Sequence, residues 1–223
     1  MLQATLLGDL YLALDNTQKS KKYYLTALQY DADQKQAILG LYRSYKRDQQ
    51  LAQVIPYLEA WLVKTPDDLH IEISLADSYK GSGQWQKSAD YYESLLTKYG
   101  QRPILLNNLA GVYFALEQHD KAKKYAEQAY GYLNGNVAII DTLAWIESRM
   151  GNHKRALALF RQALIKDFGN AETKYHLAVT LFALDRKVEA KNYLIESVES
   201  QQMFSEKAEA KALLADWLRK ENK

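Results

Sequence analysis

Residues 6–28 read LLGDLYLALDNTQKSKKYYLTAL, and residues 140–164 read IDTLAWIESRMGNHKRALALFRQAL. Both stretches place a leucine followed by a small residue, then a turn-forming pair that starts eight residues after the leucine. After the turn-forming pair, both stretches carry a small residue, a bulky residue four positions later, and a small residue three positions after that. Apolar residues three and four positions apart share one face of an α-helix. Each stretch therefore predicts two amphipathic helices joined by a tight turn.

The same arrangement recurs with a constant period of 34 over residues 1–204. When the chain is counted in blocks of that length, repeat position 7 is leucine in all six blocks, and repeat position 8 is small in five. These residues are Leu7, Leu41, Leu75, Leu109, Leu143 and Leu177, and Gly8, Ala76, Ala110, Ala144 and Ala178. Small residues let paired helices approach closely enough to bury their apolar stripes against each other. We expect helix pairs at 1–34, 35–68, 69–102, 103–136, 137–170 and 171–204, then a capping helix over 205–223 with Ser205 as its N-cap.

Repeat positions 7, 8, 11, 20, 24, 27 and 32 are the signature places of the tetratricopeptide repeat, which residues 1–204 resemble. The resemblance implies an all-α, right-handed superhelical solenoid of antiparallel helix pairs, in which the first helix of each pair lines a concave groove. It also implies a non-enzymatic scaffold that binds a peptide or protein segment in that groove. Tyr42 and Trp61 stand at positions that are usually small, so we expect the second pair to be spaced slightly wider.

Composition removes several other classes of function. The 29 basic and 27 acidic residues leave a net charge of +2. The chain therefore has no strong positive electrostatic field that would attract nucleic acid. No apolar run reaches the roughly 20 residues that span a bilayer, so we expect no membrane insertion. The absence of cysteine excludes disulfides and thiolate chemistry. The carboxylates form no converging pair, and no nucleotide-binding or hydrolase motif is present, so we expect no enzyme and no cofactor.

Histidines also argue against a metal site. No pair of histidines has the spacing of metal ligands, so we expect no metal site and interpret all four as surface or groove residues. They are His70, His119, His153 and His176.

Repeat positions 2, 5, 6, 9, 12 and 13 of the first helices face away from the buried stripe. In the fourth to sixth blocks these positions carry polar and aromatic residues that suit peptide binding. The predicted ligand-binding residues are Asn107, Asn108, Asp141, Thr142, Trp145, Arg149, Tyr175 and His176. Asn and Asp are mediocre helix formers, so helix propensity does not explain them here. The alternative is that several of these side chains bond across helices and hold the array together.

The second and third blocks place four cations at the same positions: Arg43, Lys46, Arg47 and Lys80. Such a basic patch suits an acidic peptide or a C-terminal carboxylate. The alternative is a solvated face balanced by Asp77 and Asp48. The carboxylate clamp of chaperone-binding tetratricopeptide domains is absent. Only Asn108 matches it, whereas Ile73 and Asp77 stand where that clamp has lysine and asparagine.

A second class of function is structural. The first helix is apolar on most sides, which suggests that the chain is the C-terminal end of a longer repeat array or forms a homo-oligomer through this helix. Its apolar residues are Leu2, Leu6, Leu7, Leu10 and Leu12.

A finer resemblance covers 107–130, 139–164 and 171–194. These segments are similar to the C-terminal ends of large bacterial tetratricopeptide proteins associated with exopolysaccharide export and protein sorting. That resemblance implies a periplasmic or envelope-associated scaffold, and without it we expect a cytoplasmic protein.

Overall fold

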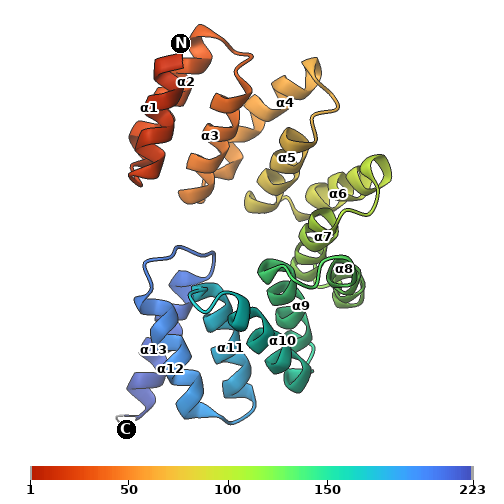
Figure 1. Cartoon of the computed structure of the whole chain (residues 1–223), viewed down its shortest axis with the longest axis vertical. Coiled ribbons are helices and arrows are strands. Elements are labelled where there is room, and N and C mark those ends of the chain that lie inside the picture. The colour runs from red at the N-terminus through yellow and green to blue at the C-terminus, as the bar shows by residue number, and fades with distance from the viewer. Residues whose placement is uncertain (1, 222–223) are drawn as a thin grey trace. The chain divides into compact units, whose positions relative to one another are not determined.

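The computed structural model describes residues 2–221, which form thirteen α-helices and one short 3-10 helix and contain no strand (Figure 1). The chain is therefore all-α, as the sequence predicts. It divides into two compact units, Met1–Gln101 and Arg102–Lys223, and each is described by itself. Within the described residues, no helix is both long enough and apolar enough to cross a membrane.

Helix pairs build both units. Unit 1 contains α1 (Leu2–Ala13), α2 (Thr17–Tyr30), α3 (Lys35–Arg47), η1 (Leu51–Val54), α4 (Ile55–Lys64), α5 (Leu69–Gly81) and α6 (Trp85–Tyr99). Unit 2 contains α7 (Pro103–Ala115), α8 (His119–Tyr132), α9 (Val137–Arg149), α10 (His153–Lys166), α11 (Ala171–Ala183), α12 (Lys187–Glu199) and α13 (Lys207–Glu221). From α3 to α11 the first helices of successive pairs begin at residues 35, 69, 103, 137 and 171, which is the constant spacing that the sequence repeat predicts.

Each turn within a pair contains one residue in the left-handed region, always at repeat position 15. These residues are Asp15, Gln49, Gly83, Glu117, Gly151 and Asp185. The next N–H donates to a carbonyl five residues back, as in Asn16 to Tyr11 at 2.8 Å and Asn152 to Glu147 at 2.9 Å. This bond closes the first helix in a Schellman-type turn. Gln49 and Glu117 adopt the same turn, so the turn does not require glycine.

The second helix of the second pair is divided into two parts. It begins as η1 and becomes α4 only at Ile55, because Pro56 has no N–H to donate and is tolerated only in the first turn of an α-helix. Val54 and Leu58 are nevertheless fully buried. Trp61 remains half-buried, and its indole N–H donates to Asp68 at 3.1 Å.

Tyr24 is the centre of packing in unit 1. Its side chain is completely buried, and its hydroxyl donates to Oδ1 of Asp9 at 2.6 Å. A Cβ atom would lie 2.6 Å from the Tyr24 ring if placed on Gly8 and 2.2 Å from it if placed on Gly40. Real Cβ atoms do not approach so closely. The ring therefore occupies space that two glycines, on α1 and α3, leave open.

One predicted core leucine is exposed. Leu7 is 36% exposed, whereas the leucines at the same repeat position in the other five blocks are buried. Leu6, Leu10 and Leu14 are exposed beside it, but Leu12 is buried. Within unit 1, α1 packs against α2 and α3, which both follow it, and the exposed leucines lie on a face that the described helices of unit 1 leave uncovered. The side chain of Leu2 lies outside the described residues.

In unit 2 the last helix covers the end of the α11–α12 pair. Ala210 is buried with Tyr175 and Leu194, and the ring of Trp217 stacks on Phe182 with centroids 4.4 Å apart. The helix begins at Lys207 and not directly after Ser205, so Ser205 is not its N-cap. The carbonyl of Glu206 accepts the first helical bond, from Ala210 at 2.9 Å.

Candidate functional site

The two helices α9 and α11 in unit 2 start with the same kind of cap. The side chain of Asn136 accepts from the N–H of Ile139, and the side chain of Asn170 accepts from the N–H of Thr173. Asparagine at the N-cap satisfies an N–H group that has no partner within the helix. Because α9 and α11 begin at the same repeat position, residues at equivalent repeat positions lie side by side on the two helices.

This alignment of the two helices places Asp141 of α9 against His176 of α11. Oδ2 of Asp141 lies 2.8 Å from Nδ1 of His176, and the histidine is only 4% exposed. Burial alone would lower the pKa of His176, but the charge of Asp141 and its hydrogen bond, with help from Glu206 and Glu172, raise it above the usual value. The predicted surface or groove histidine is therefore a buried residue, because Asp141 supplies a partner for its ring.

Aromatic rings cover this polar pair. The Trp145 ring stacks on the His176 ring with centroids 4.2 Å apart. The centroid of the Tyr175 ring lies 6.3 Å from that of Trp145. The guanidinium of Arg149 lies over Trp145, 5.5 Å from the ring centroid. Trp145 is half-buried and Arg149 is exposed, so these two side chains are the accessible part of the cluster. We call Asp141, Trp145, Arg149, Tyr175 and His176 the α9–α11 site.

The structure does not bring the other three predicted residues into these contacts. Thr142 is half-buried, and its hydroxyl donates to the carbonyl of Ala138 in its own helix. Asn107 and Asn108 lie half-buried on α7. The side-chain oxygen of Asn107 is buried, and no hydrogen-bond partner for it is found in the described part of the chain.

Two carboxylates of this region are absent from the residues predicted from the sequence. One oxygen each of Glu172 and Glu206 and one ring nitrogen of His176 lie within 4.8 Å of one another. Glu172 stands at repeat position 2, which the groove pattern includes, so the sequence could have identified it. Glu206 lies in the segment before α13, outside the repeat, and only the folded chain shows that it reaches α11.

Glu172 holds its proton far more tightly than an ordinary glutamate. Burial raises the pKa of Glu172 to about 7, and the charges of Asp141 and Glu206 and a hydrogen bond with Glu206 act in the same direction. The positive charge of His176 opposes this rise. The carboxyl groups are thus crowded together with little compensating charge.

Each cation of the predicted basic patch in unit 1 pairs with a neighbouring carboxylate, and two of the four cations share one carboxylate. Lys46 and Lys80 both pair with Asp77, at 2.6 and 3.2 Å. Arg43 lies 3.5 Å from Asp9, and Arg47 lies 3.1 Å from Asp15. Asp48, the other predicted counter-charge, pairs instead with Lys21 at 2.5 Å.

Asp77 itself is buried and strongly held as an anion. Burial alone would raise the pKa of Asp77, but the charges of Lys80 and Lys46 and hydrogen bonds from Lys46 and Tyr42 outweigh it and lower the pKa to about 2. These pairs leave the patch little free charge for an acidic ligand.

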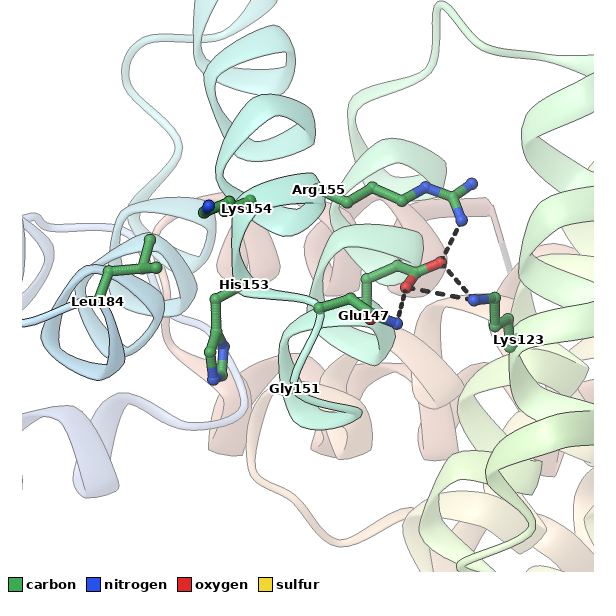
Figure 2. Close-up of a pocket in the computed structure, with 8 residues that line it drawn as sticks. Lys123, Glu147, Gly151, His153, Lys154, Arg155 and Leu184 are labelled. Carbon is green, nitrogen blue, oxygen red and sulfur yellow. Dashed lines mark hydrogen bonds and ion pairs between the residues drawn. The ribbon is translucent and has the colours of Figure 1, made fainter.

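A surface pocket in unit 2 lies at the start of α10 (Figure 2). It is lined by Lys123, Glu147, Gly151, Asn152, His153, Lys154, Arg155 and Leu184. Figure 2 shows the carboxylate of Glu147 held by Arg155 and Lys123. The buried Glu147 oxygens lie 2.5 Å from Arg155 and 3.1 Å from Lys123, and the side-chain nitrogen of Asn152 donates to one of them at 2.6 Å. Lys123, Asn152 and Arg155 thus satisfy Glu147 in a structural ion-pair network, whereas Nδ1 of His153 is buried with no hydrogen-bond partner among the described residues.

Known sequence families match most of the chain. Four sequence models described as tetratricopeptide repeats match residues 5–34, 74–101, 101–164 and 148–216, which together include more than half of the chain. These ranges leave out residues 35–73, where Pro56 interrupts the second helix of a pair. No curated protein sequence matches the chain significantly.

Three solved structures share the fold at low sequence identity. A chain of the APC/C hetero-tetramer Cut9–Hcn1 superposes with a TM-score of 0.76 at 16% identity, covering 96% of this chain and 42% of that chain. TTC0263, a thermophilic tetratricopeptide protein of Thermus thermophilus, gives a TM-score of 0.68 at 20% identity, covering 81% of this chain and 98% of that one. YrrB, described as having an unusual peptide-binding site, gives a TM-score of 0.52 at 16% identity, with 80% and 92% covered.

The present chain spans less than half the length of the Cut9–Hcn1 chain it matches. At these identities the likeness concerns the fold alone. Together with the four sequence matches, it shows that this chain belongs to the tetratricopeptide repeat proteins.

Proposed function

We propose that the chain is a non-enzymatic scaffold that binds a peptide or protein segment at the α9–α11 site. Tetratricopeptide proteins generally serve as protein-interaction scaffolds, and the similar YrrB protein is described as having a peptide-binding site. The side chains of unit 2 support the proposal independently of those relatives.

The observation that carries the proposal is the position of Arg149 over Trp145. Unlike the four cations of the basic patch, Arg149 pairs with no carboxylate among residues 2–221, and its guanidinium lies on the indole face. An arginine can bind a carboxylate with two parallel hydrogen bonds, and tryptophan is a frequent anchor of protein interfaces. The pair thus presents a cation and an apolar surface together.

The groups beneath Trp145 hold this surface in place before a partner arrives. The indole stacks on His176, which is buried and bonded to Asp141. A surface whose side chains are already ordered loses less conformational entropy on binding. We therefore expect the partner to supply a carboxylate for Arg149 and an adjacent apolar or aromatic side chain for Trp145.

The experiment is selection from a phage-displayed random peptide library on the immobilised full chain. We expect enrichment of peptides that carry an acidic residue or a free C-terminus next to an aromatic or large aliphatic residue. Selected phage should lose binding to the double variant Trp145→Ala/Arg149→Ala and keep binding to Arg161→Ala/Ile165→Ala, a pair of exposed residues on α10. Equal binding to both double variants would place the peptide site elsewhere.

A second candidate function is association through α1, which would join the chain to further repeats or to another copy of itself. The observation that favours it is the row of exposed leucines Leu6, Leu7, Leu10 and Leu14. A cluster of exposed aliphatic side chains is typical of a surface that another element covers.

The place of this scaffold in the cell is a separate part of the proposal. Its support is the resemblance of 107–130, 139–164 and 171–194 to envelope-associated and exopolysaccharide-associated repeat proteins. Fractionation of host cells that express a tagged chain tests it. Recovery with the periplasm or envelope is expected, and recovery in the cytosol alone contradicts an envelope role.

A further inference from the structure

We propose that Glu172, His176 and Glu206 bind one divalent transition-metal ion, with Zn²⁺ the first candidate. The three residues come from the first turn of α11, from the turn after it, and from the segment before α13. One potential ligand atom of each lies within 4.8 Å of the other two. The metal site shares His176 with the α9–α11 site but uses neither of its accessible side chains, Trp145 and Arg149.

The histidine is already arranged as a metal ligand. Asp141 occupies its Nδ1, so Nε2 is the nitrogen left for a ligand. Nε2 is buried and has no hydrogen-bond partner among the described residues. Histidines that bind metals commonly bond their second ring nitrogen to a carboxylate, which fixes the tautomer and the orientation of the ring. Asp141 meets that description.

Both glutamates are available to complete the set. Oε2 of Glu206 is also buried without a partner in the described part of the chain. Glu172 hydrogen-bonds with Glu206, and no lysine or arginine contributes to the shift of the pKa of Glu172. Two half-buried carboxylates without a cation would be costly in a region of low dielectric if both were ionised, and in the metal-free chain a hydrogen bond between Glu172 and Glu206 avoids this. A divalent ion would neutralise the two carboxylates and supply a partner to Nε2 of His176 and Oε2 of Glu206.

The required movement is small. Zinc binds imidazole nitrogen and carboxylate oxygen at about 2.0–2.2 Å, which places tetrahedral ligands about 3.4 Å apart. The observed separations are at most 4.8 Å. Both glutamate side chains are half-buried and have rotatable bonds, so they can close this difference while His176 and Asp141 remain in place.

The donor set narrows the choice of ion. One imidazole and two carboxylates suit Zn²⁺, and also Mn²⁺, Co²⁺ and Ni²⁺, whereas Cu(I) prefers sulfur and Ca²⁺ takes six to eight oxygens. Three protein ligands leave a fourth position for water or a partner side chain. The bound ion would connect the segment before α13 to α11 and so hold the last helix on the repeat.

Isothermal titration of the metal-depleted full chain with ZnCl₂ tests the proposal. The wild type should bind one Zn²⁺, and Glu172→Gln and Glu206→Gln should each weaken binding at least tenfold, the scale that metal-site partners contribute. Glu199→Gln, an exposed glutamate at the end of α12, makes the same chemical change and should bind like the wild type.

Two further measurements guard against misfolding and surface binding. Circular dichroism should show equal helical content in the metal-free wild type and both glutamine variants, since each substitution keeps the shape of the side chain. The Co²⁺ complex of the wild type should show the visible absorption of four-coordinate cobalt, and Glu206→Gln should lack it. The proposal is overturned if the wild type binds no Zn²⁺, or if the ligand variants bind it as tightly as Glu199→Gln.

Discussion

Nδ1 of His176 lies 2.8 Å from Oδ2 of Asp141, and this contact joins α11 to α9 across 35 residues of sequence. Both residues are buried, and Trp145 stacks on the histidine from the same helix as the aspartate. The pair therefore links the packing of two repeats to the surface that we propose as the peptide site.

Replacement of Asp141 by alanine should destabilise the protein. The change leaves Nδ1 of His176 buried without its partner, and a buried polar group that loses its hydrogen bond costs about 1–3 kcal/mol. Urea unfolding of the metal-depleted full chain measures the change in free energy. The exposed control Glu199→Ala should stay within about 0.5 kcal/mol of the wild type. An unchanged urea midpoint for Asp141→Ala would mean that the contact contributes nothing.

Alanine substitutions at two helical glycines should have opposite effects on the free energy of unfolding. In Gly40→Ala the new methyl group would meet the Tyr24 ring at 2.2 Å, so the ring must move and its bond to Asp9 must stretch. Overpacking of this kind costs about 1–3 kcal/mol. A Cβ on Gly111 of α7 would meet no atom within 4 Å, so Gly111→Ala should instead stabilise by about 0.5–1 kcal/mol. Thermal unfolding by circular dichroism distinguishes them, and a stabilising Gly40→Ala would contradict the packing.

Asp77 should make the protein sensitive to acid below about pH 4. Its pKa is lowered to about 2 in the folded chain, against about 3.9 in an unfolded one. Because the folded state favours the ionised form, Asp77 contributes about 2.5 kcal/mol of stability, which is complete above about pH 5 and is lost as the pH falls through 4 to below 2. As the pH is lowered, the urea midpoint of unfolding should fall less steeply for Asp77→Asn than for the wild type. Parallel slopes for variant and wild type would show that the ion pairs with Lys46 and Lys80 do not stabilise the fold.

Charged substitutions on α1 test association through that helix. Leu6 and Leu10 are more than half exposed, so Leu6→Glu/Leu10→Glu should leave the fold intact and abolish any self-association. Sedimentation velocity should show a concentration-dependent increase in mass for the wild type and none for Leu6→Glu/Leu10→Glu. The control Val63→Glu/Ile165→Glu, at two highly exposed positions on α4 and α10, should behave as the wild type does. A wild type that stays monomeric at all concentrations removes self-association from the second candidate function.

The repeat spacing made most of the helical architecture predictable from the sequence. Leu41, Leu143 and Leu177 are buried, because each lies on a helix that packs between earlier and later helices of its own unit. Leu7 departs from this pattern because no described helix of unit 1 precedes α1 and packs against its far side. Burial at the first repeat depends on a neighbour, which the internal pattern cannot supply.

The candidate site was predictable only in part. Position within the repeat identified Asp141, Trp145, Arg149, Tyr175 and His176 as sharing one surface, but it could not show that Asp141 and His176 are buried partners. Glu206 lies outside the repeat, so no spacing rule relates it to His176. The expectation that no metal site exists rested on histidine spacing along the chain, whereas the cluster around His176 uses a single histidine and two glutamates from separate segments.

The peptide-binding surface that we propose consists of Trp145 and Arg149, and its most direct test is a dissociation constant. Isothermal titration calorimetry measures this constant for the tightest library-selected peptide and the full chain. We predict at least tenfold weaker binding to Trp145→Ala/Arg149→Ala, because interface tryptophan and arginine each commonly contribute more than about 1 kcal/mol. Binding to Arg161→Ala/Ile165→Ala should be unchanged, with equal helical content in all three proteins. Equal affinity of the peptide for the wild type and the Trp145/Arg149 variant would contradict the proposed site.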